Sequence, residues 1–273
     1  MKKLISIIIP VYNRAEIIKP TLNSILKQSY TNWECVIIDD GSTDNTLQTL
    51  NSYVEKDQRF KVITRPANLI KGANACRNYG FSKSNGMYVN WFDSDDIMEP
   101  NFLEEKVNAF KDNADAVLHR NRYANYKLTR FRDSKFKYSS TENLFYHYAI
   151  DDIEIQTSCL MWGREFLKDK DLFDESIQRF QDNEFHIRML ALKPKIVMLD
   201  EVLATIRGGD GDSSQISAKQ NISKTKLFDI FFYKYQILRL NKKNLCKKDE
   251  VEKKYQKKRC GVFMMFWALN KIH

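Results

Sequence analysis

The sequence predicts an α/β fold in which a mostly parallel sheet is flanked by helices, followed by a helical C-terminal region. Over roughly the first third of the chain, short β-branched apolar runs alternate with segments whose apolar residues recur at helical spacing. Strands and helices in this order imply parallel strands joined by right-handed crossovers. With 43% hydrophobic residues, nine Gly and five Pro, the 273-residue chain has the composition of a globular protein with a sizeable core.

The elements of the first part follow in a regular order. Residues 4–11 form an apolar run suited to a strand that is buried on both faces. A helix is predicted where apolar residues fall at helical spacing, at Ile18, Leu22, Ile25 and Leu26. The pattern continues with a strand at 33–38, a helix begun by the N-capping types Ser42, Thr43 and Asp44, a strand at 60–64, a helix at 72–84 and a strand at 87–92.

The second part is less regular. Strands are predicted at 116–126, 155–162 and 195–206, and helices at 141–149 and 181–192. From about residue 217 the composition shifts, and within 242–259 nine residues are Lys or Arg and three are acidic. We therefore expect one domain over 1–216, divided into 1–105 and 106–216, and a basic, amphipathic helical region over 217–273.

Charge and cysteine usage narrow the class of protein. The formal net charge of +9 predicts an anionic partner, which can be nucleotide phosphate, nucleic acid or an acidic membrane surface. The five cysteines are scattered and form no C-x-x-C pair, which favours reduced thiols in a cytoplasmic compartment. No apolar run reaches the roughly 18 residues that span a bilayer. The basic C-terminal stretch is either a solvated helical face or a peripheral contact with the inner face of an anionic membrane.

Polar residues follow three of the predicted strands, at the ends where parallel α/β sheets bind ligands. They are Tyr12 and Asn13 after the first strand, Asp39 and Asp40 after the second, and residues 93–96 (Asp-Ser-Asp-Asp) after the fourth. The sequence therefore predicts a binding site along one edge of the sheet.

The acidic turn at 93–96 is the centre of the predicted chemistry. Two carboxylates one residue apart can place one group on a divalent cation and the other on a ribose, and a hard cation prefers oxygen ligands. The alternative is a solvated acidic turn, with Asp96 capping a helix near Pro100.

Two further residues have both a binding and a structural interpretation. Asp39 can accept a hydrogen bond from a nucleobase edge, or it can cap the following helix together with Asp40. Arg77 lies on the helix before the fourth strand and can reach a diphosphate, or it can pair with an acid such as Asp95.

Taken together, four stretches resemble the inverting family 2 glycosyltransferases of the GT-A fold. They are residues 7–14 (IIIPVYNR), 36–46 (VIIDDGSTDNT), 72–80 (GANACRNYG) and 91–96 (WFDSDD). The resemblance implies that Pro10, Tyr12 and Asp39 hold the nucleobase, that Asp93 contacts ribose or metal, and that Asp95 binds Mn²⁺ or Mg²⁺. The nucleotide-sugar site then comprises Pro10, Tyr12, Asn13, Asp39, Arg77, Asp93 and Ser94. It also implies that 1–105 is the nucleotide-binding half and 106–216 the acceptor-binding half.

The same resemblance implies a general base at the start of a helix in the second half. The family pattern matches Gln181-Asp-Asn-Glu-Phe185, with Gln at the position where the family has Glu. Asp182 is the expected base and Glu184 the second choice. A carboxylate in the first turn of a helix is held ionised by the dipole, so some burial must restore its basicity. Helix capping is the structural alternative.

The predicted function is inverting transfer of a sugar from a nucleotide-diphosphate donor to an acceptor hydroxyl. The resemblance to the family implies that the donor is a UDP-sugar. The acceptor is a saccharide or lipid-linked saccharide of cell-surface polysaccharide or glycolipid synthesis. Arg207 or Asp210 can assist at the donor phosphates or metal, because the family's histidine is absent from this loop. A nucleotidyltransferase and a basic nucleic-acid-binding protein remain as alternatives, although neither the glycine-rich triphosphate loop nor a nucleic-acid motif is present.

Overall fold

The computed structural model describes residues 3–110, 113–134, 144–149, 153–177 and 181–208. Its centre is a sheet whose strands are β1 (Ile5–Val11), β2 (Trp33–Asp39), β3 (Phe60–Thr64), β4 (Tyr88–Trp91), β5 (Ile97–Met98), β6 (Ala116–Ala124), β7 (Phe131–Asp133), β8 (Leu160–Gly163) and β9 (Ile196–Arg207). The helices are α1 (Ile18–Leu26), α2 (Thr46–Lys56), α3 (Ala73–Lys83), α4 (Phe102–Ala109), α5 (Leu144–Ala149), α6 (Arg164–Leu167) and α7 (Gln181–Ala191), with a 3₁₀ turn η1 at Thr157–Cys159.

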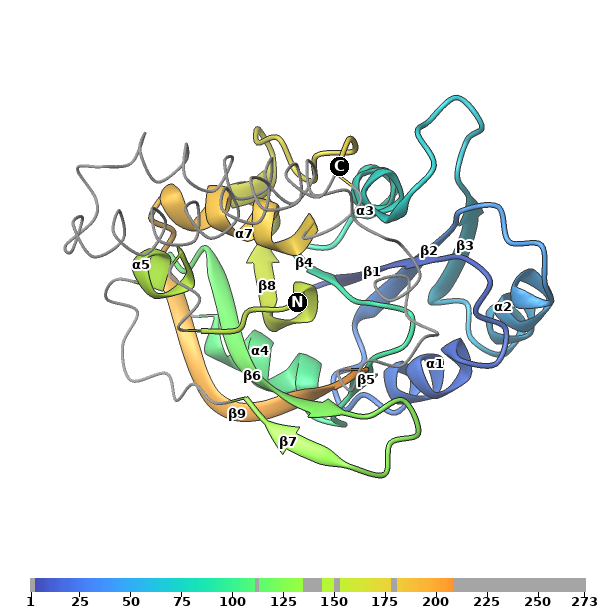
Figure 1. Cartoon of the computed structure of the whole chain (residues 1–273), viewed down its shortest axis with the longest axis horizontal. Helices are drawn as coiled ribbons and strands as arrows, with labels where there is room; N and C mark the ends of the chain where they lie inside the picture. Colours follow the sequence, from blue (N-terminus) through green and yellow to red (C-terminus); the bar gives the residue numbers. More distant parts are fainter. Residues whose placement is uncertain (1–2, 111–112, 135–143, 150–152, 178–180, 209–273) are drawn as a thin grey trace, which may run out of the picture.

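The strand order is β3-β2-β1-β4-β8-β6-β9-β5, and β7 pairs with β6. The predicted parallel half is confirmed, because β1 runs parallel to both β2 and β4, and β2 runs parallel to β3. The sheet then reverses: β8 is antiparallel to β4 and β6, whereas β9 runs parallel to β6. Helices cover both faces, with α3 and α7 on one side and α1 and α4 on the other (Figure 1).

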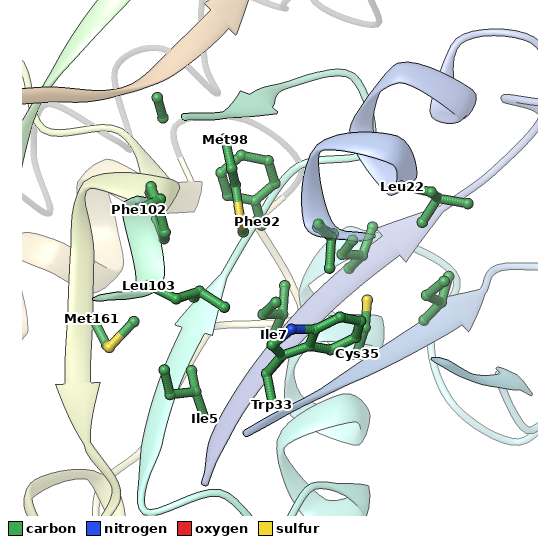
Figure 2. Packing of buried hydrophobic residues seen from close by; sticks show 14 of the residues in the cluster. Ile5, Ile7, Leu22, Trp33, Cys35, Phe92, Met98, Phe102, Leu103 and Met161 are labelled. Carbon is green, nitrogen blue, oxygen red and sulfur yellow. The ribbon is translucent and has the colours of Figure 1, made fainter. Parts of the chain in front are cut away.

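Packing on the two faces follows the alternation along β1. Ile5, Ile7 and Ile9 belong to the apolar cluster that includes residues of α1 and α4, and Figure 2 shows this face beside Leu22 and Leu103. The side chain of Ile8 points to the other face of the sheet, where it belongs to a second apolar cluster that includes residues of α7. A strand that is buried on both sides explains why the sequence of β1 is apolar without alternation.

Helix α3 packs very closely on the sheet. A Cβ atom added to Gly80 would lie 2.4 Å from Ile8 Cγ2 and 3.2 Å from Ile38 Cγ1. The small residue therefore lets the helix approach β1 and β2, as its composition suggests. The close packing at Gly80 sets the distance between the sheet and α3, the helix that carries Arg77.

One predicted strand of the second half needs correction, and two short strands were not predicted. The run 155–162 was expected to be a strand, but it begins with the 3₁₀ turn η1 and only β8 joins the sheet. The carbonyl groups of η1 explain the difference, because the oxygens of Ser158 and Cys159 accept hydrogen bonds from the side chain of Lys106, at 3.1 Å each, instead of pairing in a strand ladder. The sequence also gave no strand prediction for β5 and β7, which are short, and β7 is exposed along its length.

Lys106 of α4 is fully buried against the sheet, an unusual place for a lysine. Its Nζ donates to Asn90 Oδ1 at 2.8 Å as well as to the two carbonyl oxygens of η1. Burial lowers the pKa of Lys106 well below its usual value. The three bonds attach η1 to α4 and β4, and they fix the chain that leads into β8.

Two predictions concern residues that are only partly described. The helix expected at 141–149 is present as α5, and its first three predicted residues lie outside the described part. The amphipathic C-terminal region 217–273 and Asp210 also lie outside the described residues. Within the described residues, no helix combines the length and the apolar character needed to cross a membrane.

Candidate active site

The acidic turn directly follows β4, at the carboxyl edge of the parallel strands. The hydrogen bond from the Phe92 amide to the Ile8 carbonyl continues the pairing with β1, and the chain then turns away from the sheet. The side chains of Asp93 and Asp95 are 38% and 26% exposed, so both carboxylates are open to a ligand. Ser94 lies buried between them, and its carbonyl oxygen accepts a bond from Thr21 Oγ1 at 3.1 Å.

Asp93 is held by Arg77 of helix α3. Arg77 Nη2 lies 2.8 Å from Asp93 Oδ1, and Nη1 lies 2.8 Å from Gln181 Oε1 at the start of α7. The structure therefore shows Arg77 paired with an acid of the turn, as in the second of its two predicted roles, and the acid is Asp93 rather than Asp95. Through these two contacts, Arg77 joins the D-x-D turn (Asp93-Ser94-Asp95) to helix α7, which carries the expected base.

Asp95 is influenced by two positive groups that are distant in the sequence, Arg14 and Arg207. Arg14 Nη2, in the segment that follows β1, is 3.9 Å from Asp95 Oδ2. Burial and the neighbouring charge of Asp93 raise the pKa of Asp95, and the charges of Arg14 and Arg207 oppose this rise. Two crowded carboxylates of this kind are stabilised in their ionised form by a bound cation.

Asp96 has a structural partner. Its side chain is only 3% exposed, and Oδ1 accepts the backbone N–H of Arg207 at 3.0 Å. The carboxylate therefore ties the turn to the end of β9, and α4 begins at Phe102 without it. Burial and the charges of Asp95 and Asp93 raise the pKa of Asp96 well above its usual value.

The residues after β1 and β2 are joined to each other. Asn13 has a positive φ of 51°. Its backbone N–H donates to Ser42 Oγ at 2.9 Å, and its side-chain Oδ1 accepts the backbone N–H of Thr43 at 2.8 Å. Asp39 is fully buried, and its carboxylate accepts the N–H groups of Gly41 and Ser42. In the structure Asn13 and Asp39 thus shape the loops at this edge. Asp39 does not cap the following helix, the structural alternative considered for it, because α2 begins at Thr46 with Asn45 as its N-cap residue.

The expected nucleobase site also includes Pro10 and Tyr12. Pro10 is buried within β1, opposite Ile38 in the register with β2. The Tyr12 ring is 38% exposed, and Lys71 Nζ lies 4.0 Å from its centroid. Asp40, the neighbour of Asp39, forms an ion pair with Arg65. An exposed aromatic ring with a cation on its face is a surface on which a base can stack.

Asp182 is the second residue of α7. Burial raises its pKa, the positive charge of Arg77 lowers it, and the negative charge of Asp93 raises it. The contacts of Arg77 with Asp93 and with Gln181, the residue before Asp182, place the start of α7 beside the acidic turn. The burial makes the carboxylate more basic, as a general base at a helix start requires. The Asn183 amide donates to Asp182 Oδ1 at 2.9 Å.

Glu184, the second choice for the base, is committed elsewhere. It is 5% exposed, and its carboxylate pairs with Arg188, whose Nη2 lies 3.0 Å from Oε2. Arg188 also donates to the carbonyl oxygens of Asp171 and Leu172. This pair attaches α7 to the preceding segment, so the geometry favours Asp182 as the base.

The donor set at the turn fits a divalent cation. Asp93 and Asp95 offer two solvent-accessible carboxylates, and Mg²⁺-type sites commonly combine one or two carboxylates with substrate phosphates and water. Among the residues that the structure describes, no group of three or more His, Cys, Asp or Glu side chains is arranged to hold a metal. The residues present therefore fit a cation whose coordination is completed by the donor, not an all-protein cage.

Sequence reasoning did not single out Arg14 or Lys71 as site residues. Both follow from topology, because Arg14 comes just after β1 and Lys71 precedes α3, at the same edge of the sheet. Arg207 was considered, and the structure places it at the end of β9. Its Nε and Nη2 are buried and lack a hydrogen-bond partner among the described residues.

His186 is buried in α7 one turn after Asp182, and burial lowers its pKa to about 3. The unfolded chain protonates a histidine near pH 6.5, so between about pH 6.5 and 3 the unfolded state binds more protons. The contribution of His186 to stability is complete above about pH 6.5 and is lost as the pH falls below it. At pH 5 we expect a loss of about 2 kcal/mol.

This loss can be measured by urea unfolding at about pH 7.5 and 5.0. His186→Gln should show a smaller difference between the two pH values than the unchanged protein, since Gln does not titrate. The buried His119 is present in both proteins and cancels in the comparison. Equal pH dependence of the two proteins would contradict the assignment.

The sheet with a D-x-D turn at its carboxyl edge is the architecture of GT-A glycosyltransferases, and solved structures agree. A UDP-GlcNAc complex of Staphylococcus aureus TarS 1-349 superposes with a TM-score of 0.72 over 87% of this chain and 66% of that chain, at 22% identity. The mannosyltransferase PcManGT from Pyrobaculum calidifontis, in complex with GDP-Man and Mn²⁺, covers the whole chain with a TM-score of 0.59, at 13% identity. In one of the TarS structures, the match covers only 43% of the TarS chain.

Sequence comparisons establish the family. Residues 6–176 match the family model for glycosyl transferase family 2. A Haemophilus influenzae glycosyltransferase of uncharacterised specificity is 30% identical over 233 residues, covering 84% of this chain and 88% of that protein. The Escherichia coli UDP-Glc:alpha-D-GlcNAc-diphosphoundecaprenol beta-1,3-glucosyltransferase WfgD is 30% identical over 164 residues, or 60% and 62% of the two chains. The chain belongs to glycosyl transferase family 2, and it is a glycosyltransferase.

Proposed function

We propose that this glycosyltransferase transfers a sugar from a UDP-sugar to an acceptor hydroxyl with inversion at the anomeric carbon. The observation that carries the proposal is the arrangement of carboxylates: Asp93 and Asp95 at the sheet edge, with Asp182 on the facing helix. Arg77 connects the two sides through its contacts to Asp93 and Gln181. A donor bound at the turn would then present its sugar toward Asp182.

In this proposal the nucleotide lies along the carboxyl edge of β1, β2 and β4. The exposed Tyr12 ring stacks on the base, and the loops closed by Asn13 and Asp39 form the wall beside it. Asp93 and Asp95 would hold Mn²⁺ or Mg²⁺, which would neutralise charge on the diphosphate leaving group. The charge of Arg207 acts on Asp95, and its Nε and Nη2 have no hydrogen-bond partner among the described residues, so Arg207 is the candidate to bind a phosphate oxygen.

Asp182 acts on the acceptor. Its carboxylate accepts the proton of the acceptor hydroxyl as the oxygen attacks the anomeric carbon and the bond to the diphosphate breaks. The displacement is direct and forms no covalent enzyme intermediate, so the configuration inverts. Burial makes the Asp182 carboxylate more basic than an exposed one, while the charge of Arg77 keeps it ionised.

We further infer that the acceptor is a saccharide or lipid-linked saccharide of cell-surface polysaccharide or glycolipid synthesis. Support comes from relatives: WfgD is named for a diphosphoundecaprenol-linked acceptor, and a Bacillus subtilis relative, 39% identical over 106 residues, is the putative teichuronic acid biosynthesis glycosyltransferase TuaG. An acceptor of this kind suits a protein that works at the cytoplasmic face of a membrane. The basic region 217–273 is the segment expected to contact its anionic surface.

Thermal stabilisation by nucleotides tests the donor assignment. UDP, UDP-glucose, UDP-GlcNAc and GDP-mannose would each be added with Mn²⁺, and again with EDTA. A ligand at 100 times its Kd stabilises the fold by about 2.7 kcal/mol, or roughly 5–10 °C in Tm for a domain of this size. We expect UDP and at least one UDP-sugar to give such a shift only with Mn²⁺. A preference for GDP-mannose would overturn UDP as the nucleotide, and indifference to all four would overturn the proposed site.

A further inference from the structure

One face of helix α3 binds the segment that leads into α7. Asn78 Nδ2 donates to the Phe173 carbonyl oxygen at 2.8 Å, and its Oδ1 accepts the Phe173 amide at 3.0 Å. Asn74 Nδ2 donates to the carbonyl oxygens of Asp174 and Ile177, at 2.6 and 3.2 Å. Two asparagines, spaced about one helical turn apart, therefore fix the backbone of a segment nearly a hundred residues away in sequence.

Arg77 lies on the same helix and completes this arrangement. It is 5% exposed, and its Nη1 donates to Asn74 Oδ1 at 3.1 Å and to Gln181 Oε1 at 2.8 Å. The other end of the fork, Nη2, donates to Asp93. The guanidinium carbon lies 5.1 Å from the centroid of the Phe173 ring, which packs beside it.

The planar guanidinium of Arg77 fixes the distance between Asp93 and Gln181, which lie on opposite sides of the site. Its N–H groups have fixed directions, so a contact at each end sets the separation and orientation of the two partners. One partner, Asp93, is on the donor side, and the other, Gln181, is adjacent to Asp182. Three of the five guanidinium N–H groups donate to Asn74, Gln181 and Asp93, and Nε is buried without a hydrogen-bond partner among the described residues. The hydrogen bonds of Arg77 therefore go to protein groups on both sides of the site.

We propose that Arg77 is a positioning residue that aligns the Asp93 side of the site with Asp182, by way of Gln181. The neutral amide at 181 is suited to this role. It accepts the Arg77 hydrogen bond without adding a second carboxylate beside Asp182, which leaves Asp93 as the ion-pair partner of Arg77 within the described residues. The inference rests on the proposed function, since it takes Asp182 as the base.

The test separates positioning from phosphate binding by comparing kcat with donor KM. The probes are UDP for binding, measured calorimetrically with Mn²⁺, and UDP-glucose or UDP-GlcNAc for turnover, measured as UDP release. Gln181→Met removes the acceptor of the Arg77 bond without adding charge, whereas Gln181→Glu keeps an acceptor at the same place. Arg77→Lys keeps the charge but loses the two-ended fork. Arg122→Gln, which breaks an exposed pair with Asp133, is the control.

We expect Gln181→Met and Arg77→Lys to lower kcat by on the order of 10²-fold, as misplacement of about 1 Å can do, with UDP affinity changed by less than about threefold. Gln181→Glu should retain most of the kcat, and Arg122→Gln should retain all of it. Unchanged kcat in Gln181→Met would overturn the inference. So would a tenfold or larger loss of UDP affinity in Arg77→Lys with kcat retained, since that result assigns Arg77 to the diphosphate.

Failure of the proposed function gives a different result. Full turnover in Asp182→Asn would remove the base assignment whatever the Arg77 variants do. If Asp182→Asn is inactive and Gln181→Met is fully active, the base assignment stands and the positioning role of Arg77 is wrong. Because Gln181 is partly exposed, its substitutions are less demanding on folding than those of buried Arg77.

Discussion

Replacing Asp182 by Asn should reduce transfer by roughly 10²–10⁴-fold, the range that a general base contributes. The amide has nearly the same shape and can still accept the Asn183 N–H, so the start of α7 should be retained. It cannot take up the proton of the acceptor hydroxyl. Initial rates of UDP release with UDP-glucose or UDP-GlcNAc, with and without acceptor, measure this loss.

Binding and folding should be largely unaffected by the same change. Asp182 is half-buried, and the negative charge of Asp93 opposes its ionised form, so removing the charge relieves repulsion. UDP affinity in the presence of Mn²⁺ should therefore stay within about threefold of the unchanged protein, a difference below about 0.7 kcal/mol.

Glu184→Gln is the matched control for Asp182→Asn, two residues along the same helix. It weakens the pair with Arg188 and should lower stability while leaving the chemical step largely intact. An Asp182→Asn protein with full turnover, or a Glu184→Gln protein that folds normally but is inactive, would contradict the choice of Asp182.

Asp95→Asn should abolish the Mn²⁺-dependent part of nucleotide binding. The carboxylate is the more enclosed member of the D-x-D pair, and an amide oxygen is a weaker ligand for a hard cation. At a UDP concentration that stabilises the unchanged protein by about 2.7 kcal/mol, the variant should show little Mn²⁺-dependent stabilisation. Thermal unfolding with UDP, in Mn²⁺ and in EDTA, measures the difference directly.

The variant without ligand should be at least as stable as the unchanged protein. Burial and the charge of Asp93 raise the pKa of Asp95, so ionised Asp95 opposes folding near neutral pH and a neutral amide does not. Asp200→Asn, which removes an exposed partner of Arg120, serves as the control and should keep the full Mn²⁺ response. A normal Mn²⁺ response in Asp95→Asn would show that the cation binds elsewhere.

The first four strands and three helices could be predicted from the sequence because local pattern and tertiary position agree there. β1 is apolar apart from Ser6 since both of its faces are covered, and the parallel connection leaves few topologies to consider. The run 155–162 was misjudged because an apolar segment can be buried without pairing. What fixes η1 is the distant Lys106, and no local signal reveals that contact.

The candidate site was predictable in its location but less so in its contacts. Strand order alone brings Asp39 and Asp93 to the same edge, since β1 pairs with the strands that precede both. The use of each carboxylate was not predictable: Asp39 is bound by its own loop, and Asp93 by an arginine sixteen residues earlier. The contact between Arg77 and Gln181 joins residues 104 positions apart, beyond the reach of any spacing rule.

The antiparallel pairing of β4 with β8 has a consequence for how the protein can be divided. The expected boundary near residue 105 divides the chain into a nucleotide-binding half and an acceptor-binding half. Strand pairing nevertheless crosses this boundary, at β4–β8 and again at β5–β9. A fragment ending there would leave the edge of β4 without a neighbour and would expose the apolar surface that α4 and β8 cover. The proposed donor side and the proposed acceptor side therefore share one sheet, and we expect neither to fold as an independent module on another scaffold.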